Sequence, residues 1–137
     1  MILVDTNVIS ETLKPAPDQQ VVEWLIAHDT ELALPSIVVA ELAYGIARIR
    51  PDQRAERLER GLQSWRARFR DRIHAFSEED ALAYGRLMGE CSLSGHPMSI
   101  PDGMIAAMAR TRAASVATRN VEDFRGLQVE LVNPWAF

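Results

Sequence analysis

Short apolar runs alternate with longer helical stretches along this chain, and this alternation limits the fold more than any other feature. The first run, Ile2-Leu3-Val4, contains no polar residue, which is typical of a strand buried on both faces of a parallel sheet. Strands that alternate with helices predict a central parallel sheet of four to five strands with helices on both faces. The strands are predicted at residues 2–4, 32–34, 73–76, 115–118 and 129–132.

Capping residues and prolines indicate where the intervening helices begin and end. Asp18 and Ser36 are good N-cap residues, and the segment Arg50-Pro51-Asp52 interrupts the helical pattern. Ala55, Leu58, Leu62 and Trp65 recur at helical spacing and should form the buried stripe of the helix after this break. The helices are predicted at residues 7–14, 18–27, 37–49, 52–70, 77–94 and 103–112.

The length of 137 residues suits a single domain over residues 1–137. No apolar run approaches the roughly 20 residues that a bilayer span requires. The N-terminal run stops at Asp5, too early for a secretory signal, so we expect a cytoplasmic protein with no membrane partner. The single Cys91 excludes an intramolecular disulfide and a cysteine zinc site, and should be a small buried or half-buried residue.

The net charge of −4 hides an uneven distribution. The segment 48–72 carries nine arginines and four acids, a net charge of +5, whereas the remainder carries six basic and fifteen acidic residues, a net charge of −9. Such a basic segment suits nucleic acid or an acidic partner. It also suits a solvated helix face with internal Glu–Arg pairs, and the sequence leaves both interpretations open.

Most of the 19 acidic residues lie in polar surroundings, but three do not. Asp5 directly follows the first apolar run, at the carboxyl end of a strand, where open α/β sheets bind ligands. The alternative role for Asp5 is to cap the helix that follows. Glu41 lies in the apolar segment Ile37 to Gly45, where an unpaired carboxylate is costly. Asp102 lies at a helix start in apolar surroundings, where Ser99 is already available as a cap.

Asn120 and Asp123 follow the strand predicted at 115–118, and should lie at the same edge of the sheet as Asp5. Turn and cap chemistry would equally explain these two residue types. Carboxylates that converge at one edge raise each other's pKa, and a hard divalent cation such as Mg²⁺ or Mn²⁺ relieves the conflict. The sequence therefore favours metal-assisted hydrolysis of a phosphodiester.

These residues resemble the PIN-domain family, and more closely the VapC-type toxins of bacterial toxin–antitoxin modules. The resemblance rests on Asp5-Thr6-Asn7, on Val-Ala-Glu-Leu around Glu41, on Asp102 before Ile105-Ala106-Ala107, and on Ala117-Thr118-Arg119-Asn120. Each motif is weak alone, but their order and spacing are specific and cover nearly the whole chain. The resemblance implies a three-layer α/β/α fold and a Mg²⁺- or Mn²⁺-dependent ribonuclease.

The resemblance also assigns roles. Asp5, Glu41 and Asp102 fall on the three acidic metal-site positions of the family, with Glu41 placed to orient or deprotonate the attacking water. The fourth family position is often Asp but is Asn120 here, so Asp123 is the candidate to complete the catalytic set. Thr6, Asn7, Thr118 and Asn120 are expected to position the acids or the substrate. The products would carry a 3′-hydroxyl and a 5′-phosphate.

The family further implies an RNA substrate, a cognate antitoxin that inserts an arginine near the acids, and a homodimer that can join a larger toxin–antitoxin assembly. A receiver domain is excluded because it needs an early acid pair and a late lysine, and the only lysine is Lys14. A haloacid-dehalogenase-like phosphatase needs Asp where Asn7 stands. The remaining alternative is a catalytically weak PIN module that acts mainly in antitoxin binding and operon autoregulation.

Overall fold

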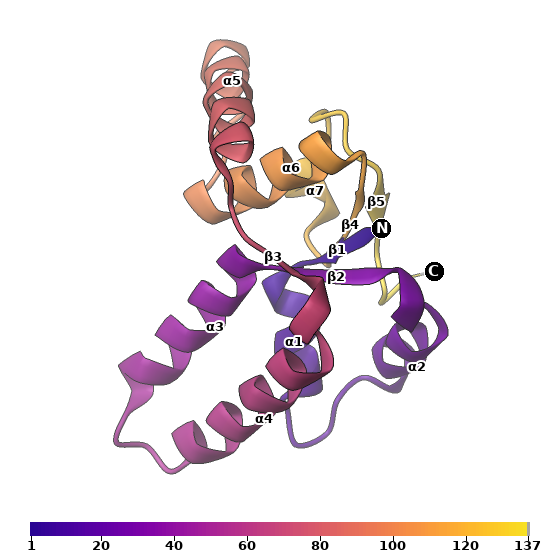
Figure 1. The fold of residues 1–137 in the computed structure, drawn as a ribbon, viewed down its shortest axis with the longest axis vertical. Coiled ribbons are helices and arrows are strands. Elements are labelled where there is room, and N and C mark those ends of the chain that lie inside the picture. The colour runs from indigo at the N-terminus through magenta and orange to yellow at the C-terminus, as the bar shows by residue number, and fades with distance from the viewer. Residues whose placement is uncertain (137) are drawn as a thin grey trace.

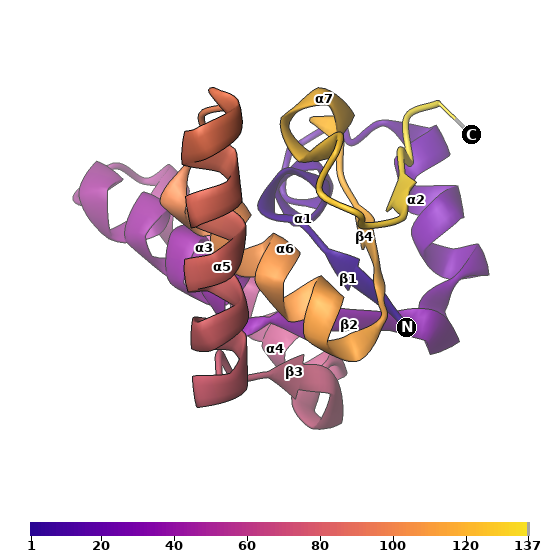
Figure 2. The same cartoon turned by 90° about the horizontal axis from the view of Figure 1, so that it is seen from above.

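The computed structural model describes residues 1–136 and shows a five-stranded parallel sheet with the strand order β3-β2-β1-β4-β5. Helices α5 and α6 cover one face, and α1, α2, α3 and α4 cover the other (Figures 1 and 2). The predicted three-layer α/β/α fold is thus confirmed. The strands are β1 Ile2–Val4, β2 Leu32–Pro35, β3 Ile73–His74, β4 Ser115–Ala117 and β5 Leu131–Val132.

The helices lie close to the predicted positions. They are α1 Thr6–Thr12, α2 Gln19–Ala27, α3 Ser36–Ile49, α4 Arg54–Arg68, α5 Glu78–Ser94, α6 Ile100–Arg112 and the short α7 Val121–Phe124, with 3₁₀ turns at Asp29–Glu31 and Arg70–Arg72. Ala55 and Leu62 are buried along α4, and Leu58 and Trp65 are half-buried beside them, as predicted. None of the helices within residues 1–136 is long and apolar enough to cross a membrane.

The order of the strands explains which face each helix covers. The chain runs outward from β1 to β2 and β3, and then returns to the other side of β1 to form β4 and β5. Right-handed crossovers place the helices of the two halves on opposite faces. The direction of winding reverses between β1 and β4, and such reversal points are where open α/β sheets leave a crevice at the carboxyl ends of their strands.

Two predictions of local structure were wrong. Ser36 does not cap α3, because it is already helical and its hydroxyl accepts a hydrogen bond from Phe76 N at 3.2 Å. That bond ties the start of α3 to the segment after β3, which leaves the sheet after His74 although strand was predicted to residue 76. The Asp18 cap on α2 is confirmed by its bond from Gln20 N at 2.9 Å. Cys91 is buried, as expected.

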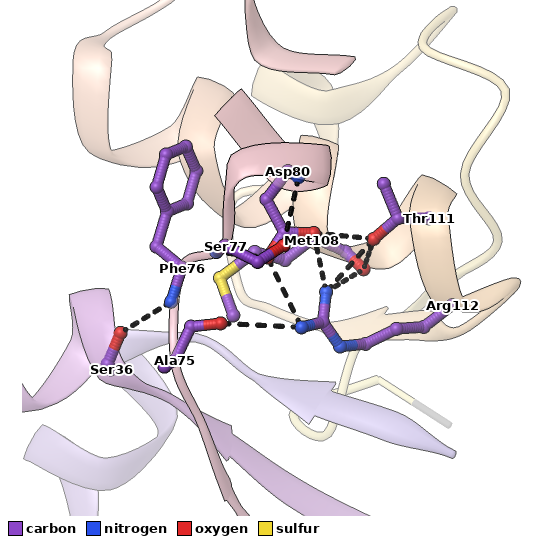
Figure 3. A network of polar contacts seen from close by, with 8 residues as sticks. All are labelled: Ser36, Ala75, Phe76, Ser77, Asp80, Met108, Thr111 and Arg112. Atoms are coloured by element: carbon purple, nitrogen blue, oxygen red, sulfur yellow. Dashed lines mark hydrogen bonds and ion pairs between the residues drawn. The ribbon is translucent and has the colours of Figure 1, made fainter. Parts of the chain in front are cut away.

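A buried ion pair joins α5 to α6 (Figure 3). Asp80 is 1% exposed and forms a capping box with Ser77 at the start of α5. Its carboxylate also accepts hydrogen bonds from Arg112 Nη1 at 2.7 Å and from Thr111 Oγ1 at 2.6 Å. Asp80 was expected to lie in polar surroundings, as most of the acids were, and this was wrong because Arg112, the partner that allows its burial, lies 32 residues away.

Candidate active site

Asp5 lies at the reversal point between β1 and β4 and is 3% exposed. Its Oδ1 accepts a hydrogen bond from Thr6 N at 2.8 Å, so Asp5 does cap α1. Its Oδ2 accepts from Thr118 Oγ1 at 2.7 Å and from Asn7 Nδ2 at 3.1 Å. The cap uses one carboxylate oxygen and the network uses the other, so the two roles suggested by the sequence coexist.

Thr118 connects three neighbouring strands. It follows β4, its side chain is completely buried, and its N–H donates to Val132 O of β5 at 2.9 Å. Its hydroxyl donates to Asp5 and accepts from Asn120 N at 3.0 Å. Asn7 adds a second link, since its Oδ1 accepts from Arg119 N at 3.1 Å. These bonds fix the Thr118–Asn120 turn against the Asp5 carboxylate.

Glu41 and Asp102 reach the same cleft from helices on opposite faces of the sheet. Glu41 is half-buried on α3, at the border of the stripe formed by Val38, Leu42 and Ile46, and its Oε1 accepts from Thr6 Oγ1 at 2.5 Å. The surroundings of Glu41 are less apolar than predicted, because neighbouring Tyr44 is 67% exposed.

Asp102 is half-buried in the first turn of α6, where its N–H donates to the Ser99 cap at 3.3 Å. Its carboxylate lines a cleft of about 400 Å³ together with Asp5 and Glu41. The three acids singled out by the sequence therefore share one cavity, although 97 residues separate the first from the last.

The electrostatics of the cleft reflect this crowding. Burial raises the pKa of Asp5, and the nearby charge of Glu41 adds to the increase, while hydrogen bonds from Thr118, Thr6 and Asn7 act in the opposite direction. Burial also raises the pKa of Asp102, with further increases from Asp5 and Asp123. The acids thus repel one another, as expected of a site that gains from a cation.

The chemistry of these donors fits a hard cation. All three acids offer carboxylate oxygens, and Mg²⁺ characteristically binds one or two carboxylates and keeps several waters. Within residues 1–136, no three His, Cys, Asp or Glu side chains are gathered tightly enough to form a complete ligand cage. Asp5 and Asp102 would therefore hold such an ion with water completing its coordination.

Asn120 and Asp123 have different positions. Asn120 lines the cleft, and its side chain makes no capping bond to α7. Asp123 is exposed and is not among the residues that line the cleft, although it is near enough for its charge to raise the pKa of Asp102. Asn120 rather than Asp123 therefore lines the cleft together with Asp5. A role for Asp123 in catalysis stays a prediction.

Five residues that were not predicted from the sequence as site residues also line the cleft: Ser10, Glu11, Lys14, Arg119 and Trp135. Glu11 is 6% exposed and accepts hydrogen bonds from Lys14 Nζ and Asp18 N, both at 2.9 Å. The bond from Lys14 is the main cause that lowers the pKa of Glu11. Glu11 follows Asn7 by four residues, so helical spacing alone places both on one face of α1.

The fold and cleft define a class: α/β/α domains with a parallel sheet and a carboxylate-lined cleft at the carboxyl ends of its strands. Within this class the chain belongs to the PIN domain family, whose model matches residues 2–128. This confirms the family resemblance seen in the sequence.

Two relatives are similar over almost their whole length. The chain is 39% identical over 137 residues to Toxin FitB of Neisseria gonorrhoeae, with 98% of this chain and 99% of the relative covered. It is 35% identical over 137 residues to VapC ribonuclease Y4jK of Sinorhizobium fredii, with 98% of each covered.

Solved structures show the same fold. FitAcB from Neisseria gonorrhoeae superposes with a TM-score of 0.91 at 38% identity and covers 100% of both chains. The structure of FitAB bound to the IR36 DNA fragment gives a TM-score of 0.90 at 38% identity, covering 100% of this chain and 97% of that one.

Proposed function

We propose that this chain is a divalent-metal-dependent endoribonuclease that acts as the toxin of a toxin–antitoxin pair. The observation that carries the proposal is the convergence of Asp5, Glu41 and Asp102 on one cleft at the reversal point of the sheet. The relatives named toxin and VapC ribonuclease support both the activity and the biological role.

Asp5 and Asp102 are the residues that would hold Mg²⁺ or Mn²⁺. When bound, the ion would supply Lewis-acid activation of water and stabilisation of negative charge on the phosphodiester. Thr118 and Asn7 donate hydrogen bonds to the Asp5 carboxylate at 2.7 and 3.1 Å, and these bonds favour its ionised form and partly offset the rise in its pKa that burial causes. The chain itself therefore opposes, without cancelling, the protonation of one of the two residues that would hold the ion.

Glu41 is placed to act on the attacking water. Thr6 fixes one of its carboxylate oxygens at 2.5 Å, which leaves the other free to accept a proton. The water oxygen forms a bond to phosphorus while the bond from phosphorus to the 3′-oxygen breaks. The departing oxygen takes up a proton, so the products carry a 3′-hydroxyl and a 5′-phosphate.

An RNA cleavage assay tests this proposal. We expect the unaltered chain to cleave RNA with Mn²⁺ and to be inactive in EDTA, and Asp5→Asn and Asp102→Asn to lose on the order of 100-fold or more in rate. Asp71→Asn is the matched control, because it removes the same charge by the same substitution at an exposed position in the Arg70–Arg72 turn. Equal cleavage by all four chains would reject the acidic site.

A second function is favoured by two observations. The relative FitAB has been solved bound to a DNA fragment, and Asn120 removes a charge that family members often carry. The chain would then be a catalytically weak module that binds its antitoxin and, in complex with it, operator DNA. Absence of cleavage of total RNA by the unaltered chain in Mn²⁺, together with operator binding by the co-purified complex, would establish this function instead.

The proposed partners are RNA, the cognate antitoxin and a second copy of the chain. The acids of the cleft would attract an antitoxin arginine as a substitute for the metal charge. An apolar groove of about 580 Å³ between α1, α2 and α4, separate from the acidic cleft, offers room for an antitoxin segment. Light scattering of the chain alone and of the co-purified complex measures the dimer and the larger assembly.

A further inference from the structure

Trp135 and Arg119 form a stacked pair at the wall of the acidic cleft. The Arg119 guanidinium carbon lies 5.0 Å from the centre of the Trp135 ring system, and both residues line the cavity that contains Asp5, Glu41 and Asp102. Arg119 is exposed and Trp135 is half-buried. Among residues 1–136, no hydrogen bond or ion pair joins either side chain to Asp5, Glu41 or Asp102, although the charge of Arg119 is near enough to help lower the pKa of Glu11.

The sheet brings these two residues together. Arg119 follows the end of β4 and Trp135 follows the end of β5, and the two strands are adjacent and parallel. Thr118 N donates to Val132 O at 2.9 Å, which aligns the two strand ends. The pair therefore lies on the same carboxyl edge as Asp5, with Arg119 one strand spacing and Trp135 two strand spacings along it, or roughly 5 and 10 Å.

The backbone of each partner is fixed. Arg119 N donates to Asn7 Oδ1 at 3.1 Å, and Asn7 in turn donates to Asp5. Trp135 N donates to Asn133 Oδ1 at 2.9 Å, which closes a turn around the buried Pro134. A residue whose backbone is already fixed beside a cleft has less conformational freedom to lose when a ligand stacks on its side chain.

We propose that the Trp135–Arg119 pair is a nucleobase subsite, on which one base of single-stranded RNA stacks beside the acidic centre. Unpaired bases are commonly recognised by stacking on aromatic rings and on arginine guanidinium planes. Every base has such a face, so the subsite distinguishes unpaired from paired RNA and selects no particular base. The inference rests on the proposed ribonuclease function for its substrate class, and it adds a residue pair that positions that substrate.

Binding in EDTA tests the subsite without any cleavage. The probes are a fluorescein-labelled 12-nucleotide oligouridylate and a ribose-phosphate 12-mer of the same length that lacks bases. We expect Trp135→Ala to weaken binding of the oligouridylate by about 10-fold or more, and to leave binding of the base-free chain unchanged. Trp135→Phe should retain most of the affinity, and Arg119→Lys should lose part of it although the charge is kept.

Intrinsic fluorescence gives an independent readout. Trp24 is 2% exposed and stacks on His28, and Trp65 donates to Thr12 Oγ1 at 2.9 Å, so Trp135 is the indole that an RNA base can reach in the cleft. We expect oligouridylate to quench the emission of the unaltered chain and of Trp65→Phe, but not that of Trp135→Phe. Melting temperatures of all variants show that the fold is kept.

Several outcomes would overturn the subsite. Equal affinity of Trp135→Ala and the unaltered chain for oligouridylate would leave the pair as a protein-docking contact. An equal loss for the two probes would point to an altered fold or charge, and no binding of oligouridylate at all would also reject it. Metal-dependent cleavage of total RNA is measured separately. Base-dependent binding without cleavage would support the subsite and reject the ribonuclease function. Cleavage that Trp135→Ala leaves unchanged would support the ribonuclease function and reject the subsite.

Discussion

At the scale of single residues, Asp5 is an almost completely buried acid in which burial and hydrogen bonds have opposite effects on the pKa. Burial raises its pKa, and the hydrogen bonds from Thr118, Thr6 and Asn7 oppose this without cancelling it. Thr118 has the largest effect among these donors. A hydroxyl 113 residues away in the sequence is therefore the main influence that opposes the effect of burial on the pKa of the first acid.

Replacing Thr118 with Val should shift the pH dependence of cleavage. The change removes the hydrogen bond to Asp5 and raises the Asp5 pKa further, so a larger fraction of Asp5 is protonated at a given pH. The acidic limb of the rate profile should move to higher pH, and stability should fall by about 1–2 kcal/mol because the oxygen that accepts from Asn120 is lost.

A profile of kcat/KM against pH in Mn²⁺ measures the shift, and urea denaturation measures the stability. Thr30→Val is the matched control, since it replaces the same residue type with valine at an exposed position. A uniform loss of rate at every pH would contradict this role of Thr118 and would indicate a general disturbance of the fold.

Neutralising Asp102 should stabilise the metal-free protein. The pKa of Asp102 is raised by folding, so its charge disfavours the folded state at neutral pH, and this penalty disappears as the pH falls through the folded pKa. In EDTA at pH 7 we expect Asp102→Asn to raise Tm by about 2–4 °C.

Bound metal should stabilise the unaltered chain more than Asp102→Asn, which is the opposite of the effect expected in EDTA. Mg²⁺ or Mn²⁺ that binds only the folded state raises Tm by mass action, and this gain should be smaller in Asp102→Asn than in the unaltered chain. Differential scanning calorimetry in EDTA and in 10-fold steps of metal concentration measures both effects, with Asp71→Asn as the control. A melt that responds neither to metal nor to the Asp102 change would show that the acids are not coupled.

At the scale of elements, the sequence predicted the order of strands and helices because burial periodicity and capping residues act locally. It missed the ends of elements that depend on distant partners. Ser36 has the residue type of a cap, yet its hydroxyl is used by Phe76 N. Asp80 has the composition of a solvated helix start, yet Arg112 from α6 makes it the most buried of the charged acids.

The Asp80–Arg112 pair gives a prediction about how α5 and α6 are held together. Burial of Asp80 opposes its ionisation, but hydrogen bonds from Arg112, Ser77 and Thr111 outweigh burial and hold the pKa well below its usual range. Arg112→Ala leaves this carboxylate buried without a counter-charge, and should lower the free energy of unfolding by about 3 kcal/mol.

The sign of the pH dependence follows from the lowered pKa. The stabilisation is fully present above about pH 5 and is lost as the pH falls through and below the ordinary aspartate pKa of 3.8. Urea denaturation from pH 7 to pH 3 should show a gap between the unaltered chain and Arg112→Ala that narrows in acid. Arg125→Ala is the control, because it breaks only an exposed pair with Glu122 and should change stability by less than about 0.5 kcal/mol. A similar loss of stability in Arg112→Ala and Arg125→Ala would contradict a special role for Arg112.

At the scale of the whole molecule, the sequence predicted that Asp5 and Asn120 lie together because the ends of parallel strands meet at one edge of a sheet, whereas Glu41 and Asp102 were singled out by their apolar surroundings on helices. Asp5 follows one strand and Asn120 another, so their proximity required only the correct fold class. Trp135 and Arg119 were not predicted, because their contact depends on β4 and β5 being adjacent and aligned. Short strands carry too little pattern to fix that alignment from sequence.

The arginine-rich segment 48–72 is partly neutralised within the protein. Arg50 lies 3.5 Å from Glu56, Arg54 lies 3.1 Å from Asp52, and Arg68 lies 3.0 Å from Asp29. Ion pairs within the protein therefore neutralise part of the basic charge, which agrees in part with the interpretation of the segment as a solvated helix face with internal pairs. Arg48 differs, because it has no carboxylate partner within 4 Å among residues 1–136 and it lines a groove shared with Glu41 and Thr6.

Arg48 should therefore contact an RNA phosphate on the α3 side of the acids. Arg48→Gln removes one such contact, so the slope of log affinity against log salt should fall by about 0.7 for single-stranded RNA. Fluorescence anisotropy with oligouridylate in EDTA from 50 to 300 mM KCl measures the slope. Arg66→Gln is the matched control, since Arg66 is exposed on α4 and donates to Gln63 at 2.8 Å, outside the groove. An unchanged slope in Arg48→Gln, or an equal decrease in both variants, would show that RNA does not follow this groove and would assign the basic segment to the antitoxin or the second subunit.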